Sequence, residues 1–332
     1  MISSYWISTL EQGLIFGIMV LGVYITYKIL DFPDLSVDGT FPLGAAVTAV
    51  CLMNGLNPFL SILLATLAGS VAGYVTGFLH VNLRITNLLS GIIVMTGLHS
   101  VNLRIMGKPN MPLFSYKSIF SYDIPPIIIL DMDITKLLII VACIVVVKVL
   151  LDLYLSTKSG FILRATGDNA QLVTSLGVDI GKSKILGVAI SNGLVALSGS
   201  LYAQYQNFSD VGMGVGIVVI GLASIIIGEA IFRKIHFVKV TFAAIVGAVI
   251  YRYCIAIALR AGLAAEDLKL VTSIIVIILL GLNNRSDLVK KVWNILKRVF
   301  EPILGPILRP IFKIIAKILN PIKKLLRTGS DK

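Results

Sequence analysis

The sequence predicts an all-α, polytopic membrane helix bundle of about 8–10 spans. Of its 332 residues, 57% are apolar and only 14% are charged, and the mean hydropathy is +0.93. One soluble core could not bury that much apolar surface. A helix that crosses about 30 Å of hydrocarbon needs roughly 20 mainly apolar residues. The long apolar runs that meet this length lie near 12–30, 57–79, 85–105, 136–156, 185–206, 214–232, 237–259 and 268–283.

A further apolar segment, 42–53 (PLGAAVTAVCLM), is shorter than the others. A straight helix of this length would barely cross, so the segment is either a short span or a re-entrant one buried in protein. If it spans, Lys28 at the end of the first run favours an outside N-terminus, and if it re-enters the order is reversed. The first residues, MISSYWISTLEQ, lack a basic region and a small-residue cleavage site, so we expect no cleaved leader.

The basic residues predict which connections face the cytoplasm. They cluster at 157–184, at 232–234 and after Arg285, and the positive-inside rule places such clusters inside. The tail 285–332 holds 12 Lys+Arg and 3 Asp+Glu. We therefore expect a membrane domain, 1–284, and a basic amphipathic cytoplasmic tail, 285–332, that lies on membrane lipids. Packing against a partner protein is the alternative, and its high aliphatic content argues against nucleic acid.

The polar segment SGFILRATGDNAQLVTSLGVDIGKSK, 159–184, separates two apolar runs. Asp168 is a good helix N-cap and Gly177 a good residue to follow a helix end, so a helix of about two turns is expected between them. Ala170, Val173 and Leu176 would share one face. This pattern suits docking to a soluble partner, and an ordinary solvated loop is the alternative.

A second polar segment lies between the first run and the short one. It carries Asp31, Asp34, Ser36 and Asp38. Irregular backbone at membrane depth is tolerated only against protein or a water-filled path. These residues are therefore candidates for the lining of a translocation path. The alternative is a solvated interface loop, which the turn residues Pro33 and Gly39 favour.

Other charged and small residues have structural interpretations. Lys148 and Asp152 are four residues apart and are expected to pair, as are Glu229 and Arg233. Small residues recur at helical spacing and predict close helix contacts in lipid: Gly69, Gly73, Gly77, Gly193, Ala196, Gly199 and Ala203. The cysteines at 51, 143 and 254 lie inside apolar runs without metal-ligand spacing, so we expect neither a metal nor a disulfide.

Three stretches resemble one family. RATGDNAQLVTSLGVDIGKSKILGVAISNGLVALSGSLYAQ is similar to the cytoplasmic signature of ABC-importer permeases of the branched-chain amino acid and ribose type. DFPDLSVDGTFPLGAAVTA, at 31–49, resembles a segment that precedes a glycine- and alanine-rich helix in those permeases. GIVVIGLASIIIGEAIF, at 216–232, is similar to their glycine-rich late span. The resemblance covers about 12–284 and is closest to the tryptophan/tyrosine transport permeases.

The resemblance implies a permease subunit of an ATP-driven importer in a bacterial plasma membrane. Its substrate would be a small solute, an amino acid and in the closest subgroup an aromatic one. The implied partners are an ABC ATPase, an extracytoplasmic substrate-binding protein and a second permease copy, giving a homodimer. No catalytic residue or cofactor is expected in this chain, which lacks a GxxxxGK[ST] loop, so ATP and Mg would bind the ATPase.

By the same resemblance, a coupling helix contacts the ATPase. Its residues are Arg164, Ala165, Thr166, Gly167, Asp168, Asn169, Ala170, Val173, Leu176 and Gly177. The acidic residues at 31, 34 and 38 depart from the family pattern, so the substrate cannot be carried over from the sugar or branched-chain members. They leave open an ion-coupled secondary transporter that uses Asp31, Asp34 and Asp38, or a channel subunit.

Overall fold

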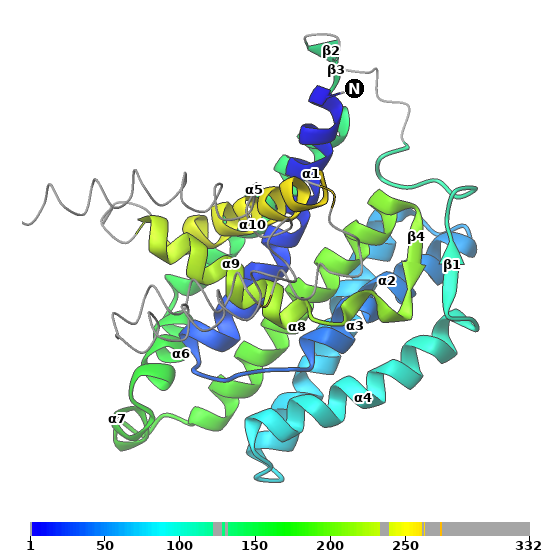
Figure 1. Ribbon diagram of the computed structural model, residues 1–332. Helices are drawn as coiled ribbons and strands as arrows, with labels where there is room; N and C mark the ends of the chain where they lie inside the picture. The colour runs from blue at the N-terminus through cyan, green and yellow to red at the C-terminus, as the bar shows by residue number, and fades with distance from the viewer. Residues whose placement is uncertain are drawn as a thin grey trace, which may run out of the picture.

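The computed structural model describes residues 2–121, 128–129, 132–232, 239–260, 262 and 273. Apart from residue 273, the predicted span 268–283 and the whole tail 285–332 lie outside these residues. Within them, the chain is a helix bundle (Figure 1). The helices long and apolar enough to cross a membrane are Tyr5–Ile29, Pro58–Val81, Asn87–Met106, Thr135–Leu155, Ile180–Gln206, Val211–Phe232 and Val240–Arg260. These helices confirm the predicted polytopic all-α fold.

The remaining elements are short. Helix α1, Ile2–Tyr24, continues as a π-helical turn, Ile25–Ile29, and α9, Ile217–Phe232, follows a 3-10 turn, Val211–Gly214. The other helices are α2 (Val37–Met53), α3 (Pro58–Val81), α4 (Asn87–Met106), α5 (Thr135–Leu155), α6 (Lys158–Asp168), α7 (Ala170–Ser175), α8 (Ile180–Gln206) and α10 (Val240–Arg260). Two antiparallel pairs join β1 (Asn110–Pro112) with β4 (Phe208–Asp210), and β2 (Ile128–Ile129) with β3 (Met132–Asp133).

Helix α8 is central because small residues let α3 approach it closely. A Cβ placed on Gly69 would lie 2.6 Å from the carbonyl oxygen of Asn192, and one on Gly77 would lie 2.8 Å from the Cα of Ile185. Side chains at these positions would collide with the α8 backbone, so only glycine permits this distance between the helices. The small-residue spacing in the sequence therefore marks a real helix contact.

The short apolar segment 42–53 is the second half of a complete crossing. At one end of the bundle, the carbonyl of Ile29 lies against Gly167 of α6. The chain then runs without helix to Ser36, whose hydroxyl donates to Asn192, about 18 Å along α8. From there α2 continues to Met53, and α3 returns to place Val81 against Gly181 at the start of α8.

The first helix decides which ends of the bundle the N-terminus and α6 occupy. Because it runs from Ile2 to Ile29, and Ile29 lies against Gly167 of α6, the N-terminus and the α6–α7 region lie at opposite ends (Figure 1). If the basic connection around α6 faces the cytoplasm, the N-terminus faces outside. The segment 42–53 is thus the helical second half of a passage along α8, with an extended first half that the sequence did not indicate.

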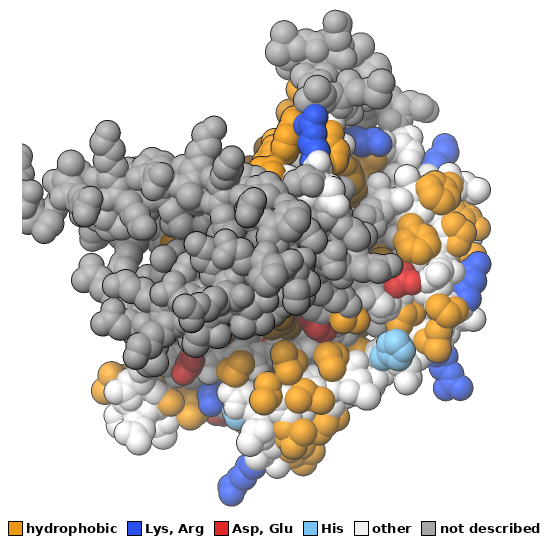
Figure 2. Space-filling model, viewed as in Figure 1, with side chains coloured by type: hydrophobic (Ala, Val, Ile, Leu, Met, Phe, Trp, Pro, Cys, Tyr) orange, Lys and Arg blue, Asp and Glu red, His pale blue; other side chains and the backbone are white. Residues whose placement is uncertain are grey.

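The outer faces of the bundle are apolar. Leu63 on α3, Val71 on α3 and Leu150 on α5 expose 55, 63 and 61% of their surface. Figure 2 shows hydrophobic side chains over α4 with Lys and Arg toward its margins. Such a face is stable in hydrocarbon and not in water, as expected of a membrane protein.

Candidate functional site

Helix α6 is held against the end of the bundle by its own small and apolar residues. Thr157 caps it by accepting a hydrogen bond from the Gly160 amide at 3.3 Å. Leu163 is fully buried, and Thr166 is 3% exposed. Gly167 lies against the carbonyl of Ile29, where a side chain would not fit. The contact ties α6 directly to the end of the first membrane helix.

The predicted two-turn helix between Asp168 and Gly177 is present as α7, but its predicted N-cap is wrong and a separate helix, α6, precedes it. Asp168 is the last residue of α6, and Asn169 is the N-cap of α7. The Asn169 side chain accepts from the Leu172 amide at 3.0 Å, while its backbone, at φ −154°, leaves the helical region. Gly177 ends the turn at φ +76°, as predicted for a residue after a helix end.

The apolar face of α7 also differs from the predicted one. Val173 is only 3% exposed because it faces the chain itself. Leu172 and Leu176, four residues apart, expose 55 and 72% of their surface instead. Phe161 on α6 adds a third large apolar side chain, 60% exposed. We call α6, α7 and Leu176 the docking end.

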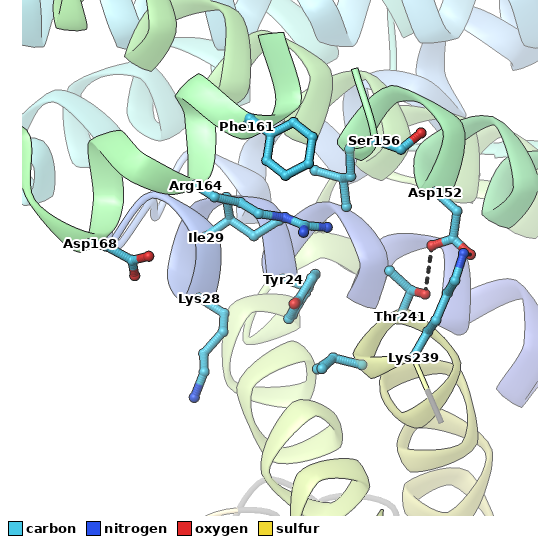
Figure 3. Close-up of a pocket in the computed structure, with 12 residues that line it drawn as sticks. Tyr24, Lys28, Ile29, Asp152, Ser156, Phe161, Arg164, Asp168, Lys239 and Thr241 are labelled. Carbon is cyan, nitrogen blue, oxygen red and sulfur yellow. Dashed lines mark hydrogen bonds and ion pairs between the residues drawn. The ribbon is translucent and has the colours of Figure 1, made fainter. Parts of the chain in front are cut away.

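A recess of about 580 Å³ lies beside α6 (Figure 3). Asp152 in its wall accepts from Lys148 at 2.7 Å and from Thr241 at 2.8 Å, and lies 3.3 Å from Lys239. Arg164 points into the recess, and Asp168 lies at its edge. The predicted Lys148–Asp152 pair is confirmed.

Glu229 forms an ion pair that the sequence did not suggest. Its carboxylate lies 2.9 Å from the Lys28 ammonium, across 201 residues of sequence. The expected partner, Arg233, lies outside the residues that the structure describes. This ion pair ties the end of α9 to the end of the first helix, beside the docking end.

Four polar side chains meet where the extended segment joins α2. Asp34, 5% exposed, accepts from the Ser36 amide and from the Asn192 side chain, each at 2.8 Å. The Asn192 oxygen accepts from Ser36 at 3.2 Å and from Thr40 at 2.7 Å. The side chains of Asp34, Ser36, Thr40 and Asn192, which we call the polar junction, satisfy one another within the membrane part of the chain.

The other two predicted path residues lie apart from the polar junction. The Asp38 carboxylate accepts from the amides of Gly216 and Val218, both at 2.9 Å, and so caps the start of α9. Asp31 is exposed near the end of the first helix, with φ at +50°. The structure therefore brings Asp34 and Ser36 together and gives Asp38 and Asp31 separate surroundings.

Residues 5–283 match a protein family described as branched-chain amino acid transport system, permease component. The chain belongs to this permease family. The permease is 51% identical over 285 residues to a tyrosine transport system permease protein of Clostridioides difficile, covering 86% of this chain and 93% of that one.

More distant relatives of the permease support the same assignment. It is 38% identical to an uncharacterized protein of Rickettsia prowazekii, over 85% of this chain and 99% of that one. It is 27% identical to a nucleoside ABC transporter permease protein of Lactococcus lactis, over 64% and 74% of the two chains. No solved structure matches it significantly. The permease is thus a multi-pass membrane component of a transport system and not itself an enzyme.

Sequence reasoning about the permease overlooked two polar residues inside membrane helices, one buried and one partly buried. Asn192 lies midway along the predicted span 185–206, and Arg252 lies inside the predicted span 237–259. Both carried a detectable signal, because strongly polar groups inside membrane helices are rare and mark buried contacts or functional sites. Asn192 completes the polar junction, and Arg252 lies among aromatic side chains of neighbouring helices.

Proposed function

We propose that the chain is the permease subunit of an ATP-driven importer for an aromatic amino acid of the tyrosine class. Family membership supports a transport subunit, and the 51% identical tyrosine permease supports this substrate. The importer would contain two copies of this chain, a separate ABC ATPase that binds ATP and Mg, and an extracytoplasmic substrate-binding protein.

The docking end is the observation that most supports ATP coupling. Phe161, Leu172 and Leu176 are each more than half exposed at an end of the bundle that carries basic connections. Large apolar side chains exposed to water mark a surface that a partner covers. Transport systems of this family use an ATPase, so we assign that role to the surface formed by α6 and α7.

The polar junction gives little support to the ion-coupled alternative. A carboxylate that binds a coupling cation must leave its oxygens open to that cation. Asp34 instead accepts from one amide and one side-chain N–H, and Asp38 accepts from two backbone amides. We place both residues beside the translocation path, where they hold α2 against α8 and α9.

Reconstituted uptake tests the proposed function. The permease, its ATPase and the binding protein are placed in proteoliposomes, and tyrosine uptake is measured with ATP, without ATP and with ionophores. We expect uptake that requires ATP and survives the collapse of ion gradients. Uptake that persists without ATP, or that stops with the ionophores, would contradict the proposal and favour ion coupling.

The proposal for the tail is separate. We expect 285–332 to be cytoplasmic and to bind the inner leaflet through its 12 Lys+Arg. An isolated peptide of this segment should bind anionic vesicles and detach as salt rises. Salt screens charges that lie further apart than about 8 Å at physiological ionic strength, and this distance shrinks as the salt concentration increases. Equal binding to neutral vesicles would contradict this electrostatic role.

A further inference from the structure

Arg252 is a charged residue in the interior of a membrane-spanning helix. It lies 12 residues from Val240 at the start of α10 and 8 residues from Arg260 at its end, which is about 18 and 12 Å along the helix. A charge at this depth is costly unless it is paired or serves a function. Its surroundings therefore decide what it does.

The guanidinium of Arg252 has aromatic neighbours and forms no ion pair with a described acidic residue. Its Cζ lies 4.3 Å from the centre of the Phe16 ring, and Nη2 donates to the Tyr202 hydroxyl at 3.3 Å. Its Nε is buried and has no hydrogen-bond partner. Among the described residues, the cation is held by an aromatic ring and a hydroxyl and takes part in no ion pair.

Aromatic rings from three helices form a wall beside it. Phe16 of α1 lies edge-on to Tyr202 of α8 at 5.0 Å, and Phe41 of α2 lies 5.7 Å from Phe16 and 5.8 Å from Tyr202. Phe16 and Phe41 are 5 and 0% exposed, whereas Tyr202 and Arg252 are only partly buried. The accessible part of the cluster therefore combines a cation, a hydroxyl and an aromatic surface.

We propose that this cluster is a substrate subsite in which Arg252 binds the carboxylate of an aromatic amino acid and the partly exposed Tyr202 contacts its ring. The inference rests on the proposed function. A guanidinium pairs with a carboxylate through two parallel hydrogen bonds, and aromatic rings favour edge-to-face contacts of the kind that Phe16 and Tyr202 already make. Tyr202 is a positioning residue for Arg252 through its hydroxyl.

The subsite and the polar junction lie on the same two helices. Phe41 follows Thr40 on α2, and Tyr202 lies ten residues after Asn192 on α8, about 15 Å further from the docking end. A substrate entering from the end opposite the docking end would reach Arg252 first. The polar junction would then lie beyond it along the same pair of helices.

Equilibrium binding to the permease–ATPase complex in nanodiscs tests this subsite without the binding protein. The probe is radiolabelled tyrosine, with 3-(4-hydroxyphenyl)propionate and tyramine as competitors. The propionate keeps the ring and the carboxylate, whereas tyramine lacks the carboxylate. We expect saturable tyrosine binding in which the propionate competes at least about tenfold better than tyramine. Tyramine lacks the carboxylate and so loses a hydrogen bond to the charged guanidinium, which corresponds to at least this factor.

Variants identify the residue responsible. Arg252→Gln should weaken tyrosine binding at least about tenfold and remove the preference for the propionate, and Arg252→Lys should retain part of both. Arg260→Gln is the matched control, since Arg260 is exposed on the same helix and lies 5.8 Å from the Trp6 ring. It should bind tyrosine as the unmodified protein does.

Several results would overturn the subsite. These are unchanged binding in Arg252→Gln, equal competition by the two analogues, or no saturable binding by the unmodified complex. The competition experiment keeps the test decisive if Arg252→Gln does not fold. Failure of ATP-dependent uptake by the unmodified protein would instead contradict the proposed function, so the two failures are distinguishable.

Discussion

The docking end exposes apolar side chains, whereas the polar junction buries polar ones. Both differ from the usual distribution, in which apolar side chains are buried and polar ones are exposed. At the docking end, Leu172 and Leu176 are exposed where the chain meets water. In the polar junction, Asp34 and Asn192 are buried within the membrane part of the bundle. Polar groups in the membrane must find partners in the same chain, and the polar junction contains them. The exposed apolar groups of the docking end have no such partners in the described chain, and the proposed function assigns their cover to the ATPase.

The largest effect is expected at the docking end. Leu176→Asp should abolish ATPase co-purification and ATP-dependent uptake, because a buried unpaired charge at the interface is strongly unfavourable. The free energy of unfolding of the permease alone should change by less than about 0.5 kcal/mol, since the residue is exposed. Pull-down and thermal unfolding measure these two quantities.

Phe114→Asp is the matched control for that prediction. Phe114 is 75% exposed and follows β1, away from α6 and α7. This variant should retain the ATPase. If Leu176→Asp also retained it, the docking end would not be the coupling surface.

The polar junction should show the opposite behaviour, with a loss of stability before any loss of partners. Asn192→Leu leaves Asp34 Oδ2 and the Ser36 hydroxyl without their hydrogen-bond partner, while Thr40 keeps only its bond to the Ser36 carbonyl. We expect a loss of about 3 kcal/mol or more in the free energy of unfolding, measured by denaturation in detergent. Ser200→Ala, which removes one buried bond to Thr48 at 2.6 Å, should cost only about 1 kcal/mol. Equal effects would show that the polar junction is not a cooperative network.

Helix packing beside the polar junction can be tested by the sign of a stability change. Gly69→Ala should lower the free energy of unfolding by about 1–3 kcal/mol, because the new methyl group would meet the α8 backbone. Gly97→Ala on α4 should raise it by about 0.5–1 kcal/mol, since no atom lies within 4 Å and alanine favours helix. A stabilising Gly69→Ala would mean that α3 and α8 are further apart than the structure has them.

A modest effect on stability is expected at Asp38. Asp38→Ala removes the acceptor for the amides of Gly216 and Val218 and should cost about 1 kcal/mol, as for other lost helix caps. We expect uptake to fall further than this cost implies, because the residue joins α2 to the start of α9. Normal uptake kinetics at normal expression would limit Asp38 to a structural role.

The two regions also differ in how far the sequence predicted them. The end of α7 at Gly177 was predictable, because glycine readily adopts the positive φ that follows a helix end. The exposed polar segment was predictable from its composition. The break at Asn169 was not, because Asp168 is an equally good cap by residue type. The close contact of Gly167 with Ile29 keeps Asp168 in α6, and that contact joins residues more than a hundred positions apart.

The sequence by itself determined the membrane class, the long spans, the small-residue helix contacts and the Lys148–Asp152 pair, because each depends on residues that are neighbours along one helix. Only the tertiary structure decided that Lys28 pairs with Glu229, that Asn192 completes the polar junction, and that Arg252 lies over Phe16. These contacts join residues 150 to 240 positions apart, and their partners are chosen by how helices pack. Local periodicity shows which face of a helix is small or apolar, but it does not show which other helix that face meets. The partner of each face therefore required the tertiary structure.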